Sequence, residues 1–229
     1  MSASSSPRGG RPERVLVLGL GRFGSTAART LESLGYEVTA LDLLESHVAG
    51  IADAVSLAVQ GDSTDETMLR SLDVERNDVA IISQGESVES SMTTTLLLKQ
   101  LGIRHVIATA KSDIHASLLR RVGADRVVFP ERDAAERLAR SLAVPQIDDY
   151  LTITDATGIA TINAPDHAVG TTVAALERRC GEAVRVVGLV RSGELISLPG
   201  GAATVERGDG IVVIGDDATL ETFAQITTA

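Results

Sequence analysis

The sequence contains no tryptophan, and aromatic residues make up only 2% of its 229 residues. Because hydrophobic residues still make up 44%, any core must be built from aliphatic side chains. The single cysteine, Cys180, excludes a disulfide within the chain, and such sparse use of cysteine is typical of a reducing cytosol. Two arginines precede Cys180 and could activate its thiol, but an inert cysteine is the simpler interpretation.

Long apolar runs and an excess of basic residues are absent as well. No run approaches the ~18–20 apolar residues that a membrane helix needs, and residues 1–10 lack the apolar segment of a secretory signal. The formal net charge is −10, which disfavours nucleic acid and anionic membrane surfaces as partners. We therefore expect a cytoplasmic protein with no transmembrane segment of its own and no nucleic acid partner. Another subunit would have to hold it at a membrane.

The first part of the chain alternates between short apolar runs and helical stretches. Residues 1–13, rich in Ser, Gly, Pro and Arg, are expected to form a disordered arm. Apolar runs that can be buried on both faces are typical of a parallel sheet covered by helices. The pattern therefore predicts a Rossmann-like doubly wound α/β domain over residues 14–143. The expected strands are Val15–Leu18, Glu37–Leu41, Ser56–Val59, Val79–Ser83, Val106–Ala110 and Arg126–Phe129.

Helices are expected between these strands, for example over Gly24–Leu34 and Ser90–Leu101. Gly35 and Gly102 come just after these two helices, where a left-handed C-cap favours glycine. A further amphipathic helix is expected over Asp133–Ala143, ahead of a break at Val144-Pro145-Gln146.

A second, smaller α+β domain is predicted over residues 144–229. Short strand-like segments dominate it, and one helix is expected near Thr171–Cys180. Turns are expected at Asp166, Ser192-Gly193 and Gly200-Gly201. The strand-like segments are Leu151–Thr154, Ile159–Ile162, Val184–Arg191, Glu194–Leu198 and Gly210–Ile214.

A glycine-rich motif directly follows the first expected strand and opens the first expected helix. Gly19, Gly21 and Gly24 form the pattern G-x-G-x-x-G, with Arg22 and Phe23 inside it. The first glycine permits a tight turn, the second lets the backbone approach a diphosphate, and the third lets the helix pack closely on the strand. The helix N-terminus would then offer N–H groups to the phosphates. This combination predicts a nucleotide site; an accidental glycine-rich turn is the alternative.

Asp42 ends the second expected strand, where a carboxylate can accept hydrogen bonds from ribose hydroxyls. A carboxylate there would repel a 2′-phosphate, so NADP is disfavoured. Arg22 could reach a terminal phosphate or cross a subunit boundary, or it could simply be exposed to solvent.

Further polar residues follow the other expected strands, at the edge where open α/β sheets bind ligands. Asp62 could accept a hydrogen bond from an adenine amino group, or it could cap the next helix, or both. Ser83, from the segment Ser83-Gln84-Gly85, and Lys111 fall on the same edge. Glu131 follows the last strand, either as a solvated or capping residue or as a ligand for a divalent cation.

Enzymatic signatures are missing from the sequence. His47, His105, His115 and His167 are scattered without metal-ligand spacing, and no G-x-S-x-G element occurs. The small second domain offers no cluster of ionisable groups to hold a substrate. We therefore expect a binding protein rather than an enzyme. An NAD(H)-dependent oxidoreductase and a stand-alone nucleotide or redox sensor are the alternatives.

Taken together, these motifs resemble the regulator-of-K⁺-conductance family, of the Ktr and Trk type. The resemblance covers nearly the whole chain after residue 13, and the domain pair makes it more specific than the glycine loop alone. The matching segments are Gly19–Gly24, Asp42, Gly61-Asp-Ser-Thr-Asp65, Phe129-Pro-Glu131 and Val205–Gly215.

The resemblance implies a cytosolic gating subunit that forms homodimers and then an octameric ring beneath a membrane potassium channel or transporter. It implies binding of ATP, ADP or NAD(H), with Gly19, Gly21 and Gly24 at the phosphates and Asp42 at the ribose. It places Asp62 and Ser63 beside the adenine and Arg22 at the terminal phosphate.

The resemblance also implies a divalent cation, Mg²⁺ or Ca²⁺, near Glu131 at the dimer interface. Some relatives bind cyclic di-AMP in the C-terminal domain, where Ile159–Asn163 and Val184–Val190 would line the cleft.

Overall fold

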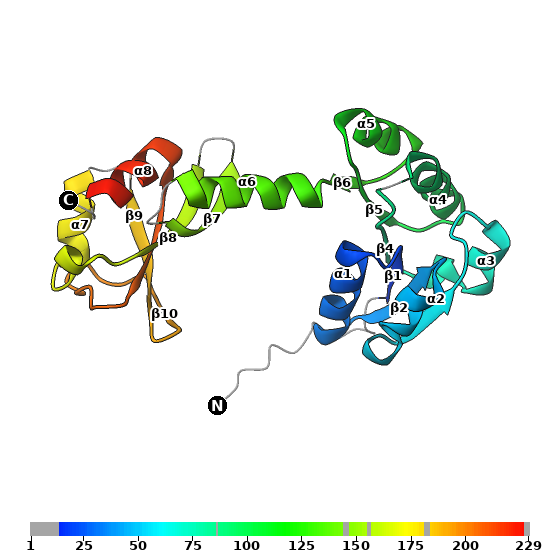
Figure 1. Cartoon of the computed structure of the whole chain (residues 1–229), viewed down its shortest axis with the longest axis horizontal. Coiled ribbons are helices and arrows are strands. Elements are labelled where there is room, and N and C mark those ends of the chain that lie inside the picture. The colour runs from blue at the N-terminus through cyan, green and yellow to red at the C-terminus, as the bar shows by residue number, and fades with distance from the viewer. Residues whose placement is uncertain (1–13, 86, 144–146, 155–156, 181–183, 227–229) are drawn as a thin grey trace. The chain divides into compact units, whose positions relative to one another are not determined.

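The chain folds into two compact units that divide between Pro130 and Glu131 (Figure 1). The computed structural model describes residues 14–85, 87–143, 147–154, 157–180 and 184–226. The division falls before the helix that we expected to close the first domain, whereas the sequence placed the boundary after that helix. The expected break at residues 144–146 and the expected arm at residues 1–13 lie outside the described residues.

The first unit is built on a six-stranded sheet in which every neighbouring pair is parallel. The strand order is β3-β2-β1-β4-β5-β6, so the direction of winding reverses between β1 and β4. This confirms the Rossmann-like fold. The strands are β1 (Arg14–Leu18), β2 (Glu37–Asp42), β3 (Leu57–Gln60), β4 (Val79–Ile82), β5 (His105–Thr109) and β6 (Arg126–Val128).

Strand β1 explains why the expected strands are apolar throughout. Val15 and Val17 pack into one hydrophobic cluster, and Leu16 and Leu18 pack into another, so both faces of the strand are buried. The intervening helical elements are α1 (Arg22–Ser33), α2 (Glu45–Ala49), η1 (Ala52–Ala54), α3 (Glu66–Ser71), η2 (Val74–Arg76), α4 (Val88–Gln100) and α5 (Asp113–Val122).

Glycines end two of these helices as the sequence predicted. Gly35 and Gly102 have φ angles of +94° and +89°, in the region that favours glycine because a Cβ would be strained there. The chain can therefore reverse directly after α1 and α4 and enter the next strand.

The second unit is a five-stranded antiparallel sheet in the order β10-β9-β11-β8-β7. Its strands are β7 (Ile147–Thr154), β8 (Thr157–Asn163), β9 (Arg185–Arg191), β10 (Glu194–Ser197) and β11 (Gly210–Asp216). Its helical elements are α6 (Pro130–Ala143), η3 (Asp166–Ala168), α7 (Val173–Cys180) and α8 (Asp217–Ile226). The smaller α+β domain is thereby confirmed.

Helix α8 was not predicted from the sequence. Leu220 and Phe223 lie three residues apart on this helix, and both are fully buried in the core of the second unit. Among the described helices of the chain, none is long and apolar enough to cross a membrane.

One ion pair of the second unit joins a buried carboxylate to a partly exposed arginine. Arg191 makes two parallel hydrogen bonds to Asp209, from Nε to Oδ1 at 2.9 Å and from Nη2 to Oδ2 at 2.8 Å. Asp209 is only 1% exposed and also accepts a hydrogen bond from the Glu206 backbone N–H. The Arg191 hydrogen bonds outweigh burial and hold the pKa of Asp209 below its ordinary value.

This ion pair should make stability depend on pH. A carboxyl whose pKa is lowered by folding stabilises the fold above its unfolded pKa of about 3.9, and that contribution is lost as the pH falls further. We expect Asp209→Asn to lower the thermal midpoint at neutral pH, with the difference from wild type shrinking as the pH falls from about 5 to about 2.

Asp166→Asn is the matched control for this prediction. Asp166 pairs with Arg207, but the two side chains are 81% and 79% exposed, so the change should shift the midpoint little at any pH. If the two variants shifted the thermal unfolding midpoint equally, the stabilising role of the Arg191–Asp209 pair would be contradicted.

Candidate functional site

The first glycine of the motif turns the chain sharply at the end of β1. Gly19 has a φ angle of +90°, and its N–H donates to the carbonyl oxygen of Leu41 at 2.8 Å. A Cβ at residue 19 would lie 2.5 Å from the carbonyl oxygen of Ser83. The loop is therefore wedged between the ends of β2 and β4, at the point where the winding of the sheet reverses.

The other two glycines have different surroundings. A Cβ at Gly24 would lie 1.9 Å from the carbonyl oxygen of Gly19, so no larger residue fits without moving the backbone. A Cβ at Gly21 would meet nothing within 4 Å. Gly24 thus permits close packing of α1 on the loop, while Gly21 leaves open space at the loop surface where a diphosphate could approach the backbone.

Helix α1 begins at Arg22 with its N-terminus open. Gly21 occupies the N-cap position and provides no side-chain cap, and the first turn holds no acidic residue. The first N–H groups of a helix have no partner within the helix, and the helix dipole makes this end positive. Arg22 and Phe23 are both exposed there. The arrangement suits a phosphate group.

Asp42 is held at the end of β2 by backbone donors. Its Oδ2 accepts a hydrogen bond from the N–H of Leu20 at 2.5 Å, and its Oδ1 accepts one from the N–H of Leu44 at 2.8 Å. Burial is the largest influence and would raise the pKa of Asp42, but these hydrogen bonds and the nearby His47 together lower it. Asp42 is therefore ionised and fixed beside the glycine loop.

His47 was not predicted to belong to the site. Its Nδ1 lies 3.2 Å from Oδ1 of Asp42, although no hydrogen bond of good geometry joins them. The signal available in the sequence was its place in α2, the helix that directly follows β2.

Asp62 and Ser63 follow β3 and point in different directions. Asp62 is exposed, and its Oδ1 accepts hydrogen bonds from the Thr64 hydroxyl and N–H at 2.7 and 2.8 Å. These bonds, the side-chain bond first, lower the pKa of Asp62. Ser63 is only 3% exposed, and its hydroxyl is bonded to Gln84 and Thr94.

The capping role weighed for Asp62 belongs instead to Asp65. The side chain of Asp65 accepts a hydrogen bond from the Thr67 N–H and forms the N-cap of α3. The suggestion that Asp62 caps this helix was therefore wrong, because the helix begins three residues later than that role requires.

Ser83 and Lys111 lie on the same edge of the sheet, after the neighbouring strands β4 and β5. The N–H of Ser83 donates to the carbonyl oxygen of Leu18 at 2.7 Å, which ties the start of the β4–α4 loop to the end of β1. Lys111 is exposed, and its N–H lies 3.5 Å from Nδ1 of the buried His115. Burial, more than Lys111, lowers the pKa of His115. These residues line the edge that carries the glycine loop.

Glu131 is exposed in the first turn of α6, the element that opens the second unit. Within the residues that the structure describes, no group of three His, Cys, Asp or Glu side chains could hold a metal ion. A cation at Glu131 would therefore need ligands from a bound phosphate or from another chain.

The segments expected to line a cyclic di-AMP cleft are not adjacent in the second unit. Strands β8 and β9 lie on either side of β11, and alternate side chains of both strands are buried in the core. Only the remaining side chains of these strands could meet a ligand or a partner.

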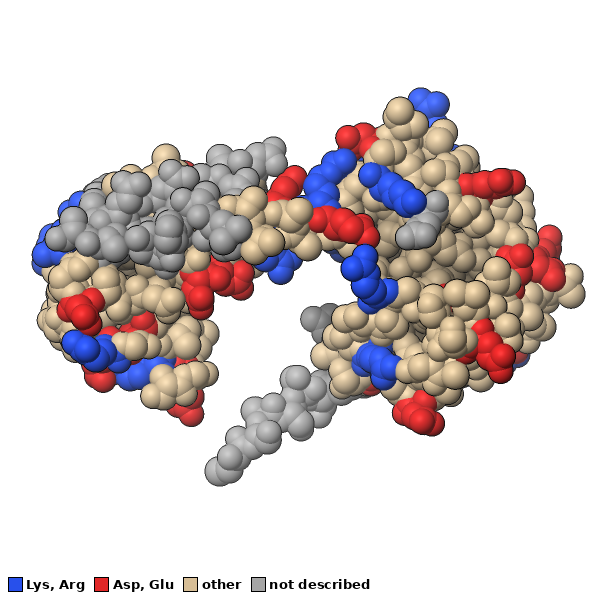
Figure 2. All heavy atoms as spheres, in the orientation of Figure 1, with Lys and Arg blue, Asp and Glu red and all other residues tan. Residues whose placement is uncertain are grey.

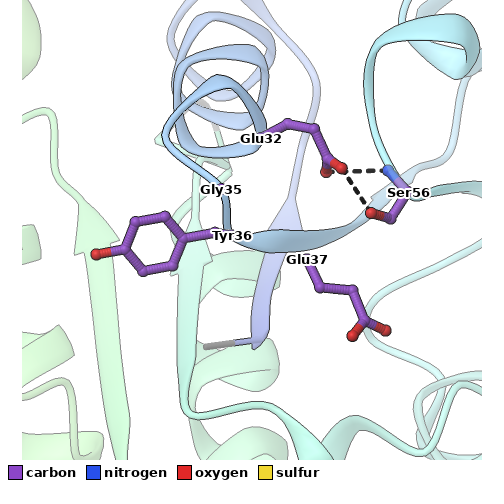
Figure 3. Close-up of a pocket in the computed structure, with 5 residues that line it drawn as sticks. All are labelled: Glu32, Gly35, Tyr36, Glu37 and Ser56. Atoms are coloured by element: carbon purple, nitrogen blue, oxygen red, sulfur yellow. Dashed lines mark hydrogen bonds between the residues drawn. The ribbon is translucent and has the colours of Figure 1, made fainter. Parts of the chain in front are cut away.

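A hollow of about 280 Å³ lies at the opposite edge of the first sheet (Figure 3). Glu32 accepts hydrogen bonds there from the Ser56 hydroxyl at 2.6 Å and from the Val38 N–H at 3.1 Å, which ties α1 to β2 and to the residue before β3. Glu37 is paired with Arg14. Two carboxylates in this hollow would repel phosphates, so the glycine loop is the better candidate site.

Charged side chains do not gather by sign on the visible faces. Acidic and basic groups are interspersed over each unit (Figure 2).

Comparison with known proteins assigns both parts of the chain. The TrkA-N domain model matches residues 15–130, and the TrkA-C domain model matches residues 159–227. Ktr system potassium uptake protein C of Bacillus subtilis (strain 168) is 35% identical over 207 residues, which cover 90% of this chain and 94% of the relative. Ktr system potassium uptake protein A of Vibrio alginolyticus is 31% identical over 208 residues, which cover 91% and 94%.

Solved structures support the fold. The GsuK channel superposes with a TM-score of 0.63 at 22% identity, covering 94% of this chain and 39% of the channel chain. The GsuK channel bound to NAD gives a TM-score of 0.56 at 22% identity, covering 96% and 39%. This chain thus corresponds to a part of those longer chains.

The glycine loop gives a direct structural test. We expect Gly24→Ala to destabilise the first unit by about 1–3 kcal/mol or more, because the new methyl group collides with backbone rather than with a movable side chain. Gly21→Ala, the matched control, should change stability by less than about 1 kcal/mol, since its methyl group enters open space. Thermal unfolding measures the stability of both variants. Equal stability of Gly24→Ala and Gly21→Ala would contradict the close packing described at Gly24.

Proposed function

Because the chain belongs to the regulator-of-K⁺-conductance family, with a TrkA-N and a TrkA-C domain, we propose that it is the nucleotide-sensing regulatory subunit of a potassium uptake system. The observation that carries this proposal is the conjunction of the open glycine loop with the ionised Asp42. The loop suits a diphosphate and the carboxylate suits a ribose, which is the division of labour in dinucleotide-binding folds.

The ligand is an adenine nucleotide: ATP, ADP or NAD(H). A carboxylate offers about four lone-pair sites. Leu20 and Leu44 use one on each oxygen of Asp42, which leaves acceptor capacity for ribose hydroxyls. A 2′-phosphate would meet the ionised carboxylate, so NADP(H) is disfavoured. Ser83 and Lys111 lie farther along the same edge of the sheet, where the rest of the nucleotide would extend.

Regulation requires the ligand to favour one of two conformations. A nucleotide shifts a conformational equilibrium only by the difference between its affinities for the two states. ATP and ADP differ by the γ-phosphate alone, so the discriminating groups must lie near the terminal phosphate. Arg22 is exposed in the first turn of α1 and is the candidate, together with a divalent cation, Mg²⁺ or Ca²⁺, near Glu131 at the dimer interface.

The partner is a membrane-embedded potassium channel or transporter subunit. Relatives of this chain are named as Ktr potassium uptake proteins. We place the protein on the cytoplasmic side, as homodimers assembled into an octameric ring whose shape follows the bound nucleotide. The C-terminal domain is the place where a second ligand such as cyclic di-AMP would act. A binding role without catalysis is proposed.

Calorimetric titration of the full chain with ATP, ADP, NAD⁺ and NADH, with and without Mg²⁺ or Ca²⁺, tests this function. We expect binding that Asp42→Asn weakens by about 10–100-fold, since a charged acceptor of ribose hydroxyls is lost. Asp53→Asn, which alters an exposed aspartate of η1, should leave affinity unchanged. Steady oxidation of NADH by the protein would contradict the proposal. Equal nucleotide affinities of wild type and Asp42→Asn would contradict it as well.

Arg22→Ala should separate the two adenine nucleotides. Loss of one charge-assisted hydrogen bond to the γ-phosphate would weaken the binding of ATP by about tenfold and leave the affinity for ADP nearly unchanged. Arg70→Ala is a suitable control, because Arg70 pairs with Glu66 on the exposed surface of α3. If the ratio of the affinities for ATP and ADP were the same in Arg22→Ala as in wild type, Arg22 would not be the group that distinguishes the two nucleotides.

A further inference from the structure

Three polar side chains form a closed hydrogen-bonded ring in the interior of the first unit. Gln84 Nε2 donates to Ser63 Oγ at 2.6 Å, and Ser63 Oγ lies 3.0 Å from Thr94 Oγ1. Thr94 Oγ1 in turn donates a hydrogen bond to Oε1 of Gln84 at 3.3 Å. With the Ser63 hydroxyl donating to Thr94, every hydroxyl hydrogen has an acceptor and the donors run in one direction around the ring.

The ring joins three elements that the sequence separates. Ser63 follows β3, Gln84 follows β4, and Thr94 lies on the inner face of α4. Thr94 is completely buried and Ser63 is 3% exposed. Buried hydroxyls must be paired, and Thr94 Oγ1 also lies 3.3 Å from the Ser63 carbonyl oxygen, so Ser63 and Thr94 find their partners within the ring and the turn. The Ser63 hydroxyl hydrogen is thereby used within the ring rather than donated to a nucleotide.

The ring fixes the turn that carries Asp62. One side of this turn is anchored by the Gly61 N–H, which donates to the carbonyl oxygen of Asp42 at 2.9 Å. The other side is anchored by Ser63 through the ring. Between these two anchors the Asp62 carboxylate is exposed, with Oδ1 bonded to Thr64. Its direction is therefore set from both ends of the turn.

The ring also reaches the glycine loop. A Cβ at Gly19 would lie 3.1 Å from Cγ of Gln84, so the stem of this side chain packs against the turn at the end of β1. Gln84 thus links the expected phosphate-binding loop to the turn after β3.

We propose that Ser63, Gln84 and Thr94 are positioning residues that set the base preference of the nucleotide site by aiming the Asp62 carboxylate at the amino group of adenine. This inference rests on the proposed function. Adenine offers a donor at that position, whereas hypoxanthine offers an acceptor that would face the carboxylate unpaired. The ring itself touches no ligand and acts only through the turn.

Thr94→Val removes the hydroxyl and keeps the shape of the side chain. Thr95→Val is the matched control, because Thr95 is also completely buried on α4 but its hydroxyl donates to the Ser91 carbonyl of its own helix. Thr94→Ser restores the hydroxyl without the methyl group. Ser63→Ala opens the ring from the other side and serves if Thr94→Val folds poorly.

The experiment is calorimetric titration of the full-length variants with ADP and with inosine 5′-diphosphate, which carries a carbonyl oxygen in place of the amino group and a proton on the neighbouring ring nitrogen N1. We expect wild type, Thr95→Val and Thr94→Ser to prefer ADP by about tenfold or more, the size of one hydrogen bond to a charged group. Thr94→Val and Ser63→Ala should bring the ratio of the two affinities close to one.

Equal weakening of both nucleotides by Thr94→Val, with the ratio kept, would mean that the ring only supports the fold and would overturn the inference. A wild type that binds both nucleotides equally would overturn it too, since Asp62 would then read no amino group. A wild type that binds neither would overturn the inference, and one that also fails to bind ATP and NAD(H) would overturn the proposed function with it.

Discussion

Helix α1 lies against the end of β1 only because residue 24 has no Cβ. A methyl group there would lie 1.9 Å from the Gly19 carbonyl oxygen, and a Cβ at Gly19 would lie 2.5 Å from the Ser83 carbonyl oxygen. This close approach brings the open N-terminus of α1 to the edge of the sheet where the winding reverses. The other features of the candidate site, from Asp42 to the turn after β3, surround that helix end.

Asp42 and the buried side chains Ser63 and Thr94 at this edge are hydrogen-bonded within the protein itself. Asp42 is bonded to two backbone N–H groups of neighbouring loops, and the ring of Ser63, Gln84 and Thr94 satisfies its own donors. Pairing avoids the penalty of burying unsatisfied polar atoms and fixes the loops at the same time. The edge is thus preorganised, which reduces the entropy lost when a nucleotide binds.

Local patterns were sufficient for much of the architecture. Runs such as Val15–Leu18 are apolar because both faces are buried, and Gly35 stands where the backbone requires a positive φ, so both could be predicted. Helix α8 was missed because its two core residues are too few to reveal a period. The inward turn of Ser63 could not be predicted either, since its partners come from β4 and α4, more than 20 residues away along the chain. The G-x-G-x-x-G pattern and the acid that ends the second expected strand marked the glycine loop and Asp42 as candidates, but neither signal included His47 or Thr94.

Hydrogen exchange of the backbone amides, compared with and without ADP, tests the central claim most directly. If the glycine loop and the turn after β3 form the nucleotide site, protection should rise in residues 19–24 and 61–63 of the first unit. The first-turn amides of α1 should gain the most, because they have no partner within the helix. Protection confined to the second unit, or no change in these two segments at saturating ADP, would contradict the account.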